Sequence, residues 1–357
     1  MNTKLKSIVV LMLAAGLSCS AIAGPFGYRV PLKGLALSAN TAPTTGTGSN
    51  GSGTGTGTGG STAPAGTGSD GSTAPADVGD VTPAPPIVEV TPITLSYATP
   101  GVYSVTVPEG YSSMSAKMWG AGGNGSKYVG GNVSFTSGTG GGGGFTSATV
   151  PITPGATLLI VVGTAGSATR SPYYGGGGRG EGYAAGGYSG IFLNAETQAN
   201  ALLMAGGGGG SGITINGGVC TVTSSGHVAG GGGGAVGTAG GGGGAGSQSA
   251  GGAGRYPGAA LKGGNGYSTH VDCGQGGAGG GGYFGGGSGT ASSSNTGGTS
   301  GGGGSGFVHP LATNVVSLSS GRSSAPANLS DPDRGGAGQG GGGGPGTGNG
   351  KVVVVFQ

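Results

Sequence analysis

Two glycine-framed motifs in the sequence have the spacing of catalytic or cofactor-binding sites. Residues 120–125 satisfy GxGxxG, with which dinucleotide-binding folds place backbone amides around a pyrophosphate. Residues 298–302 satisfy GxSxG, which presents a nucleophilic serine in α/β-hydrolases. Both sites require a helix directly after the motif, and the glycine-rich stretches that follow here are poor helix formers. A chain so rich in glycine also meets both patterns by chance, so we predict no catalytic residue, no cofactor and no enzyme activity.

Cys220 and Cys273 are the only cysteines after residue 23. In an oxidising compartment two lone cysteines usually pair, and closing a loop of this span would stabilise the fold by about 4 kcal/mol in the chain-entropy model. Zinc is the alternative. His227 and His270 lie near the two cysteines in sequence, but no CxxC or HxxxH spacing supports a zinc site. We predict a disulfide and no metal at these residues.

Two acidic residues, Asp331 and Asp333, flank a proline near the end of the chain. Their carboxylates could ligate calcium together with backbone carbonyls. A pair at this spacing more often caps a turn, and the neighbouring Arg334 offers a counter-charge. We favour the turn and keep calcium as the weaker alternative.

Aromatic residues recur at the borders of the glycine runs. Glycine supplies no apolar area, so aromatic side chains there would fill the seams of a glycine-rich fold. Phe145, Phe192 and Phe307 stand in strand-like contexts and are predicted core residues. The others are Tyr173, Tyr174, Tyr188, Tyr256, Tyr283 and Phe284.

Tyr173 and Tyr174 lie between Arg170 and Arg179 in a predicted loop. Loops on a rigid scaffold often carry binding residues, and aromatic residues and arginine are enriched at protein interfaces. We assign these four residues to a candidate contact patch. The structural alternative is that the tyrosines only fill a seam.

The composition limits the elements that could position such residues. Glycine supplies 100 of 357 residues and charged residues only 6%, against a usual glycine share of about 7%. Too few side chains remain for a helical core or a coiled coil. Runs such as 206–210 break the strict three-residue glycine period that collagen requires.

The first 23 residues have the pattern of a secretory signal peptide. Lys4 and Lys6 precede an apolar run at 8–17, and Ala21-Ile22-Ala23 fits the cleavage site. Cleavage after Ala23 removes two lysines and no acid, so the formal net charge falls from +3 to +1 and nucleic acid becomes an unfavourable partner. No later stretch approaches the ~20 apolar residues of a transmembrane helix. We expect a secreted protein, extracellular or at the cell surface, with the periplasm as the alternative.

The rest of the chain divides into three parts by composition. Residues 24–39 form a short N-terminal segment. Residues 40–92 are a low-complexity stretch of Gly, Ser, Thr, Ala and Pro without Lys or Arg. Such a stretch cannot bury enough apolar area to offset its ordering and is predicted to be a disordered linker. Residues 93–357 are predicted to be one glycine-rich domain.

Strand patterns begin after residue 92. Residues 102–107 and 114–119 alternate, with Lys117 expected to face water. Residues 145–150 and 157–162 follow, separated by Pro151 and by Pro154-Gly155, which has the turn chemistry of a hairpin. Residues 158–162 and 352–356 are apolar on both faces, which predicts interior strands. The second of them must pair with strands from the start of the domain.

Eight runs of four or more glycines lie between these strands, at irregular intervals that exclude a simple solenoid. Ordering each residue costs on the order of 1–2 kcal/mol, and a hydrogen bond returns about 0.5–1.5 kcal/mol, so nearly every amide needs a partner. Parallel packing of extended, three-residue-per-turn helices would supply these partners, because backbones without Cβ atoms approach closely. We predict a bundle of such helices laid against the β-sheet.

Several blocks resemble a known family of glycine-rich domains. Residues 98–108 and 118–123 resemble the opening of the glycine-rich domain of secreted bacterial and phage tail proteins. Other blocks are similar to the extracellular glycine-rich domain of the anaplastic lymphoma kinase and leukocyte tyrosine kinase receptors: 202–210, 282–287, 304–308 and 350–354. The resemblance covers about residues 93–357. It implies a mainly β fold, a tumour-necrosis-factor-like β-sandwich with an inserted polyglycine II helix bundle and almost no α-helix.

We therefore expect a secreted, non-enzymatic surface or extracellular-matrix protein, an adhesin or structural interaction module. Its partner would be an extracellular protein or a polysaccharide surface. One alternative is a receptor- or cytokine-like binding module for one defined protein ligand. Another is a polysaccharide- or ice-binding protein, although the irregular spacing of threonine counts against ice.

Overall fold

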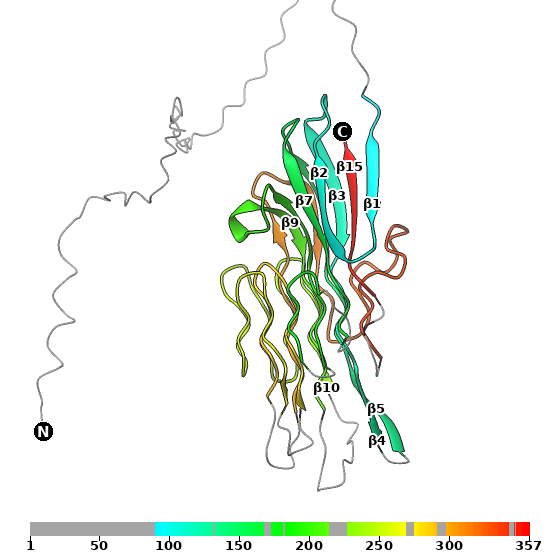
Figure 1. Ribbon diagram of the computed structural model, residues 1–357, viewed down its shortest axis with the longest axis vertical. Coiled ribbons are helices and arrows are strands. Elements are labelled where there is room, and N and C mark those ends of the chain that lie inside the picture. The colour runs from blue at the N-terminus through cyan, green and yellow to red at the C-terminus, as the bar shows by residue number, and fades with distance from the viewer. Residues whose placement is uncertain are drawn as a thin grey trace, which may run out of the picture. The chain divides into compact units, whose positions relative to one another are not determined.

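The computed structural model describes residues 90–130, 133–167, 173–180, 183–213, 227–268, 275–290, 298–342, 346 and 348–357. All of them belong to the unit that spans Pro83–Gln357. This part of the chain is mainly β, and its helical content is the single 3-10 turn η1 (Gln198–Asn200) (Figure 1). Within it, no helix has the length and apolar character that crossing a bilayer would require.

Two five-stranded antiparallel sheets form a sandwich-like arrangement. The order in the first sheet is β1 (Ile93–Tyr97), β15 (Lys351–Phe356), β3 (Ser113–Trp119), β6 (Phe145–Pro151) and β14 (Thr313–Leu318). The order in the second is β13 (Phe307–Val308), β9 (Ala201–Ala205), β8 (Ser189–Leu193), β7 (Thr157–Val162) and β2 (Gly101–Thr106). The mainly β fold expected from the sequence is therefore confirmed.

The two strands with apolar residues on both faces are interior strands, as predicted. In β15, Val352 pairs with Met118 of β3 on one side and with Tyr97 of β1 on the other. β7 lies between β2 and β8. The last strand described is therefore held between two strands from the start of the same unit.

The main core lies between the two sheets. Alternate residues of each interior strand point into it, so that Met114, Ala116 and Met118 of β3 are buried. The second sheet contributes Leu158, Ile160, Val162, Ile191 and Leu203, all with no exposed surface. Burial of this kind stabilises by roughly 1.5–3 kcal/mol for each large apolar side chain.

The turn at Pro154 and Gly155 forms as predicted, with Gly155 at a φ of 76°. The hairpin is wrong, because the flanking strands do not pair with each other. β6 pairs with β3 and β14, and β7 pairs with β2 and β8. The turn thus carries the chain from one sheet to the other. A turn sequence specifies the local reversal and does not specify which sheet the next strand joins.

Beyond the strands, the glycine segments are joined to one another by backbone hydrogen bonds. The five amides of residues 206–210 donate hydrogen bonds to backbone carbonyls of three other segments, and every third amide donates to the same segment. The acceptors are Gly233 and Gly230 in one segment, Gly281 and Ala278 in a second, and Ala121 in a third. The carbonyls of residues 206–210 accept hydrogen bonds from the amides of three further segments. The donors are Gly144 and Gly141 in one segment, Gly304 and Gly301 in a second, and Gly186 in a third. The N–O distances are 2.8–3.0 Å. One glycine segment is therefore surrounded by six others, which we call the glycine bundle.

The segments run in both directions, so the predicted parallel packing holds for some neighbours and is wrong for others. Gly206 and Gly209 bond to Gly233 and Gly230, in reversed order, which makes that pair antiparallel. The segment after β3 runs parallel instead, since a Cβ on Gly120 would meet the carbonyl of Gly206 and one on Gly123 that of Gly209. The segments alternate in direction because many of them continue strands of antiparallel sheets. The bundle accordingly extends the strand ends as well as covering one sheet face (Figure 1).

Short strands lie at the far end of the bundle. β4 (Ser126–Gly130) and β5 (Val133–Thr139) form a hairpin, and β10 (His227–Val228) joins β5 in parallel (Figure 1). β11 (Tyr267–Ser268) pairs with β12 (Gln275–Gly276). These pairings close connections between neighbouring glycine segments.

An apolar seam joins the bundle to the outer face of the second sheet. Phe192 and Tyr188 are fully buried there, and Tyr283 stacks on Phe307 with ring centroids 4.4 Å apart. Leu261 of the bundle packs against the same cluster. A second seam, of Trp119 and Phe145, lies beside the first sheet. The predicted core positions of Phe145 and Phe192 are confirmed, whereas Phe307 is only partly buried and packs against the edge of the cluster.

Candidate functional site

The structure brings two of the four predicted patch residues together. The guanidinium carbon of Arg179 lies 5.9 Å from the ring centroid of Tyr173, within cation–π range. The Tyr173 hydroxyl donates to the carbonyl of Ala185, and the amide of Tyr174 donates to Thr164 Oγ1 over 2.9 Å. Both tyrosines are partly buried and hold the backbone of the bundle. Arg170 lies outside the described residues.

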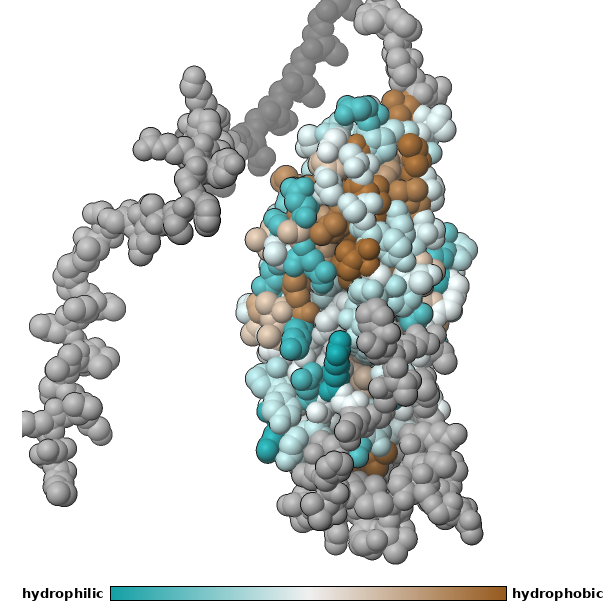
Figure 2. All heavy atoms as spheres, in the orientation of Figure 1, coloured by the Kyte–Doolittle hydropathy of each residue, from teal (hydrophilic) through white to brown (hydrophobic). Residues whose placement is uncertain are grey.

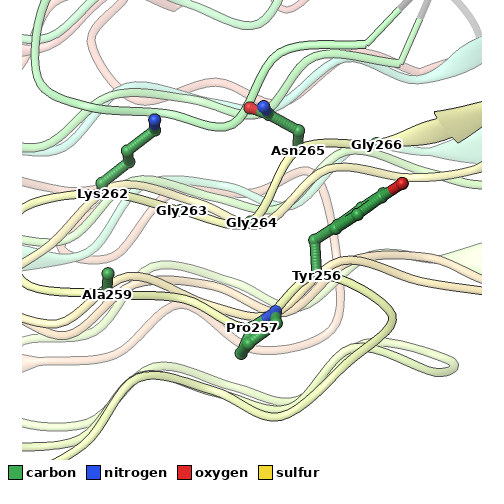
Figure 3. A pocket seen from close by; sticks show the side chains of 8 residues that line it. All are labelled: Tyr256, Pro257, Ala259, Lys262, Gly263, Gly264, Asn265 and Gly266. Atoms are coloured by element: carbon green, nitrogen blue, oxygen red, sulfur yellow. The ribbon is translucent and has the colours of Figure 1, made fainter.

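Arg179 connects this patch to a groove on the surface of the bundle. Its amide donates to Asn265 Oδ1 over 3.1 Å, and its carbonyl accepts from the amide of Gly266 over 2.8 Å. The groove has a volume of about 530 Å³, which is within the usual range for ligand pockets of ≈ 300–1,000 Å³. Its lining residues are Tyr256, Pro257, Ala259, Lys262, Gly263, Gly264, Asn265 and Gly266 (Figure 3).

A tight reversal of the chain positions the groove residues. The backbone amide of Ala259 donates to the carbonyl of Lys262, and the amide of Lys262 donates to that of Ala259. Leu261 occupies the left-handed region at a φ of 57°. That backbone is strained for a leucine by roughly 1–2 kcal/mol, and the partly buried Leu261 side chain packs against the seam, which works against the strain. With Leu261 held in the seam, the exposed Lys262 faces the solvent.

The floor of the groove consists of backbone. A Cβ on Gly263 would lie 1.9 Å from the carbonyl oxygen of Gly279, and one on Gly264 would lie 1.9 Å from that of Tyr256. Both amides are already bonded to neighbouring segments, at Gly176 and Gly286. The floor therefore has no side chains and little freedom to move.

Aromatic and basic side chains gather beside the groove. The side chain of Tyr256 is 43% exposed, and its ring centroid lies 6.0 Å from that of Tyr267. The guanidinium carbon of Arg255 stands 4.6 Å from the centroid of Tyr267. Among the described residues no carboxylate lines the groove. Glu181 and Asp272, the acids of this part of the sequence, lie outside the described residues.

Sequence reasoning found part of this site and missed the rest. Tyr256 stood out as an aromatic residue bordering a glycine run, whereas Lys262 and Asn265 did not. A lone lysine and a lone asparagine carry no motif. The only available signal was that basic and aromatic residues recur within a stretch otherwise made of glycine and alanine.

Asp331 and Asp333 form a turn and bind a lysine. Asp331 Oδ1 accepts from the amide of Asp333 over 3.0 Å. Lys117 Nζ lies 2.9 Å from Asp333 Oδ2 and 3.2 Å from Asp331 Oδ2. The hydrogen bond from Lys117 lowers the pKa of the Asp333 carboxyl below its usual value, and the same bond raises the pKa of Lys117.

The counter-charge of these two carboxylates is therefore Lys117 and not the predicted Arg334. The Arg334 side chain bonds instead to the carbonyls of Leu329 and Ala337. Calcium at this turn would have to displace the lysine. In the part of the chain that the structure describes, no cluster of three or more His, Cys, Asp or Glu side chains is present.

Residues of the two glycine-framed motifs form hydrogen bonds within the bundle. Ser300 of the GxSxG motif is buried, and its Oγ accepts a hydrogen bond from the amide of Gly212 over 3.1 Å. Residues 120–125 lead into the strand β4, and the amide of Gly123 is bonded to Gly141. These amides and this hydroxyl are engaged in internal hydrogen bonds.

Cys220, Cys273 and His270 lie outside the described residues, as does the side chain of His227. Two described residues that border these segments lie next to each other: Ile213, before the segment with Cys220, and Gln275, after the segment with Cys273. Ile213 and Gln275 exchange two backbone hydrogen bonds, of 2.9 and 3.2 Å. The disulfide between Cys220 and Cys273 stays a prediction that this pairing favours.

No model of a known protein family matches the chain, and no curated protein matches it. The groove and the adjoining patch of Tyr173 and Arg179, on the outside of a backbone-filled bundle, therefore have to be interpreted from their own geometry.

Proposed function

We propose that the chain is a secreted, non-enzymatic surface or extracellular-matrix protein that acts as an adhesin or structural interaction module. The observation that carries this proposal is the groove beside Arg179. It combines an exposed aromatic ring, a lysine and a floor of fixed backbone, which suits binding. The polar side chains of the catalytic motifs are used within the bundle, so binding is the function that the geometry favours.

The finer fold that we propose is a tumour-necrosis-factor-like β-sandwich with an inserted polyglycine II bundle. Two features support it. The hydrogen bonds of residues 206–210 have the period of three that a threefold extended helix requires. Six surrounding segments correspond to hexagonal packing of such helices.

The bundle suits the role of a platform. A Cβ at most of its glycines would lie within 3 Å of a neighbouring backbone atom, so the segments are in direct contact throughout. Side chains such as those of Tyr256 and Lys262 therefore stand on a support that yields little. Preorganised side chains lose less conformational freedom when a ligand binds. The predicted linker of residues 40–92 would hold this platform away from its point of attachment.

One observation favours the alternative of a single defined protein ligand. The edge strand β14 and the turn before it expose four large apolar side chains by 42–65%: Leu311, Val315, Val316 and Leu318. Among the coloured atoms of the visible face in Figure 2, hydrophobic residues gather mainly over the sheet-bearing half, and those over the bundle half are mostly hydrophilic or neutral. A protein partner would cover such a surface.

Fractionation of cells that make the protein tests its location. We expect the chain in the culture medium or on the cell surface, shortened by residues 1–23, because those residues have the pattern of a cleaved signal. Immunoblotting of each fraction and mass spectrometry of the amino terminus are the measurements. Recovery of the uncleaved chain from the cytosol alone would contradict the proposal.

A further inference from the structure

We propose that the groove lined by Tyr256, Lys262 and Asn265 binds an acidic saccharide, a hexuronate or a similarly charged sugar of a surface polysaccharide. The sugar ring stacks on Tyr256, its carboxylate pairs with Lys262, and a hydroxyl accepts from the Asn265 amide. This inference rests on the proposed adhesin function and names the class of ligand at its site.

The three side chains frame a common floor. Figure 3 shows that the side chains of Lys262 and Asn265 extend to the same side of the backbone at Gly263 and Gly264, with Tyr256 coming from the adjoining segment. The carbonyl of Tyr256 is in contact with Gly264, which fixes the spacing between the two segments. A flat ring can approach this floor closely because it carries no side chains.

The charge around the groove selects for an anion. Lys262 is exposed, and none of the ion pairs found among the described residues includes it. Two further cations lie near the lining residues, since Arg255 precedes Tyr256 in the chain and the backbone of Arg179 bonds to Asn265 and Gly266. Each guanidinium stands over a tyrosine ring. An acidic ligand would add an ion pair without displacing an internal one.

Asn265 is oriented by the bundle. Its Oδ1 accepts from the amide of Arg179, so the side-chain amide is held in one rotamer and its Nδ2 is left to donate. An acidic sugar has hydroxyl groups, a carboxylate and an apolar ring face. The amide of Asn265 can donate to a hydroxyl, Lys262 can pair with the carboxylate, and the ring of Tyr256 can stack on the apolar face.

The observations favour a saccharide over an acidic peptide. The groove is short and shallow, it is lined by four residues no larger than alanine, and it lacks a deep apolar pocket for a side chain. Nucleic acid would require a larger basic surface than a chain with a formal net charge of +3 provides.

The experiment compares charged and uncharged forms of one sugar. The full mature chain is titrated by calorimetry with oligogalacturonate and with its methyl ester, which has the same rings and no charge. We expect oligogalacturonate to bind, the ester to bind at least about tenfold more weakly, and binding to weaken as ionic strength rises from about 0.15 M to about 1 M.

Point variants then identify the groove. Lys262→Met should weaken binding about two- to fivefold, as expected for an exposed ion pair, and Tyr256→Ala about tenfold. Tyr256→Phe keeps the ring and should bind like the wild type. Arg322→Met removes a matched exposed cation elsewhere on the bundle and should change nothing. Thermal unfolding of each variant confirms that the fold is retained.

Three results would overturn the inference. They are equal binding of the ester, equal binding of an oligoglutamate peptide, and wild-type affinity of Lys262→Met and Tyr256→Ala. If oligogalacturonate does not bind while the protein is still found on the cell surface, this inference fails and the adhesin proposal stands. If the protein is confined to the cytosol, the adhesin proposal fails independently of the sugar titration.

Discussion

At the scale of single residues, the buried Tyr188 and the partly buried Tyr183 make the fold sensitive to alkali. Burial raises the pKa of the Tyr183 phenol to about 12. Burial first, and then the carboxylate of Glu196 that accepts its hydroxyl, raises the pKa of Tyr188 far above its usual value. A tyrosine in the unfolded chain ionises near pH ~10. The unfolded state therefore loses these protons first, and stability falls as pH rises above about 10.

We expect these tyrosines to leave the free energy of unfolding unchanged from neutral pH to about pH 10 and to lower it from there towards pH 12. Ionisation of the phenols, followed by tyrosinate absorbance, should show one tyrosine that titrates only when the protein unfolds and another that titrates late, near pH 12. Tyr188→Phe keeps the ring in the seam and removes the proton. Its alkaline loss of stability should be smaller than that of the wild type, and an unchanged pH profile would refute the assignment.

At the scale of elements, the bundle depends on the absence of a single carbon atom at most of its positions. A Cβ on Gly208 would lie 2.0 Å from the carbonyl oxygen of Gly141. The segment of Gly208 is hydrogen-bonded to six neighbouring segments, one of which contains Gly141, so neither backbone can easily move away. Gly321, by contrast, has nothing within 4 Å of its ideal Cβ. The two glycines provide a matched test.

Gly208→Ala is expected to destabilise the protein by about 3 kcal/mol or more, the upper range for overpacking. Gly321→Ala should be neutral, or stabilising by up to about 1 kcal/mol, because alanine restricts the unfolded chain. Thermal and denaturant unfolding measure both changes. Similar stabilities for the two variants would mean that the bundle tolerates side chains at its contacts.

The positions of the strands could be predicted from the sequence, whereas the pairing of the strands into sheets could be predicted only in part. Residues 102–107, 114–119 and 145–150 form β2, β3 and β6 within one residue, because alternation records which face is buried. The sheet to which each belongs depends on pairings far along the chain. The groove was unpredictable for the same reason, since Arg179 and Asn265 are 86 residues apart and meet only through the bundle.

At the scale of the whole molecule, the predicted disulfide would link two parts of the chain that are more than 50 residues apart in sequence. Reduction, or the double variant Cys220→Ser and Cys273→Ser, should lower the free energy of unfolding by about 4 kcal/mol. Denaturant unfolding with and without reductant measures the loss. The mature chain should also show no free thiol until it is denatured and reduced. Free thiols in the native, unreduced protein would contradict the pairing.

The position of β15 has a consequence for how the protein is made. The first sheet cannot close around β3 until β15 has been synthesised, which is after nearly all of the described chain. The glycine segments likewise bond to partners distant in sequence, and long-range pairing of this kind makes folding slow. If the chain is exported as we propose, a nascent chain that still lacks β15 cannot complete the first sheet, so export through a narrow channel could precede folding. Under that proposal, the late synthesis of β15 would delay folding until export has begun.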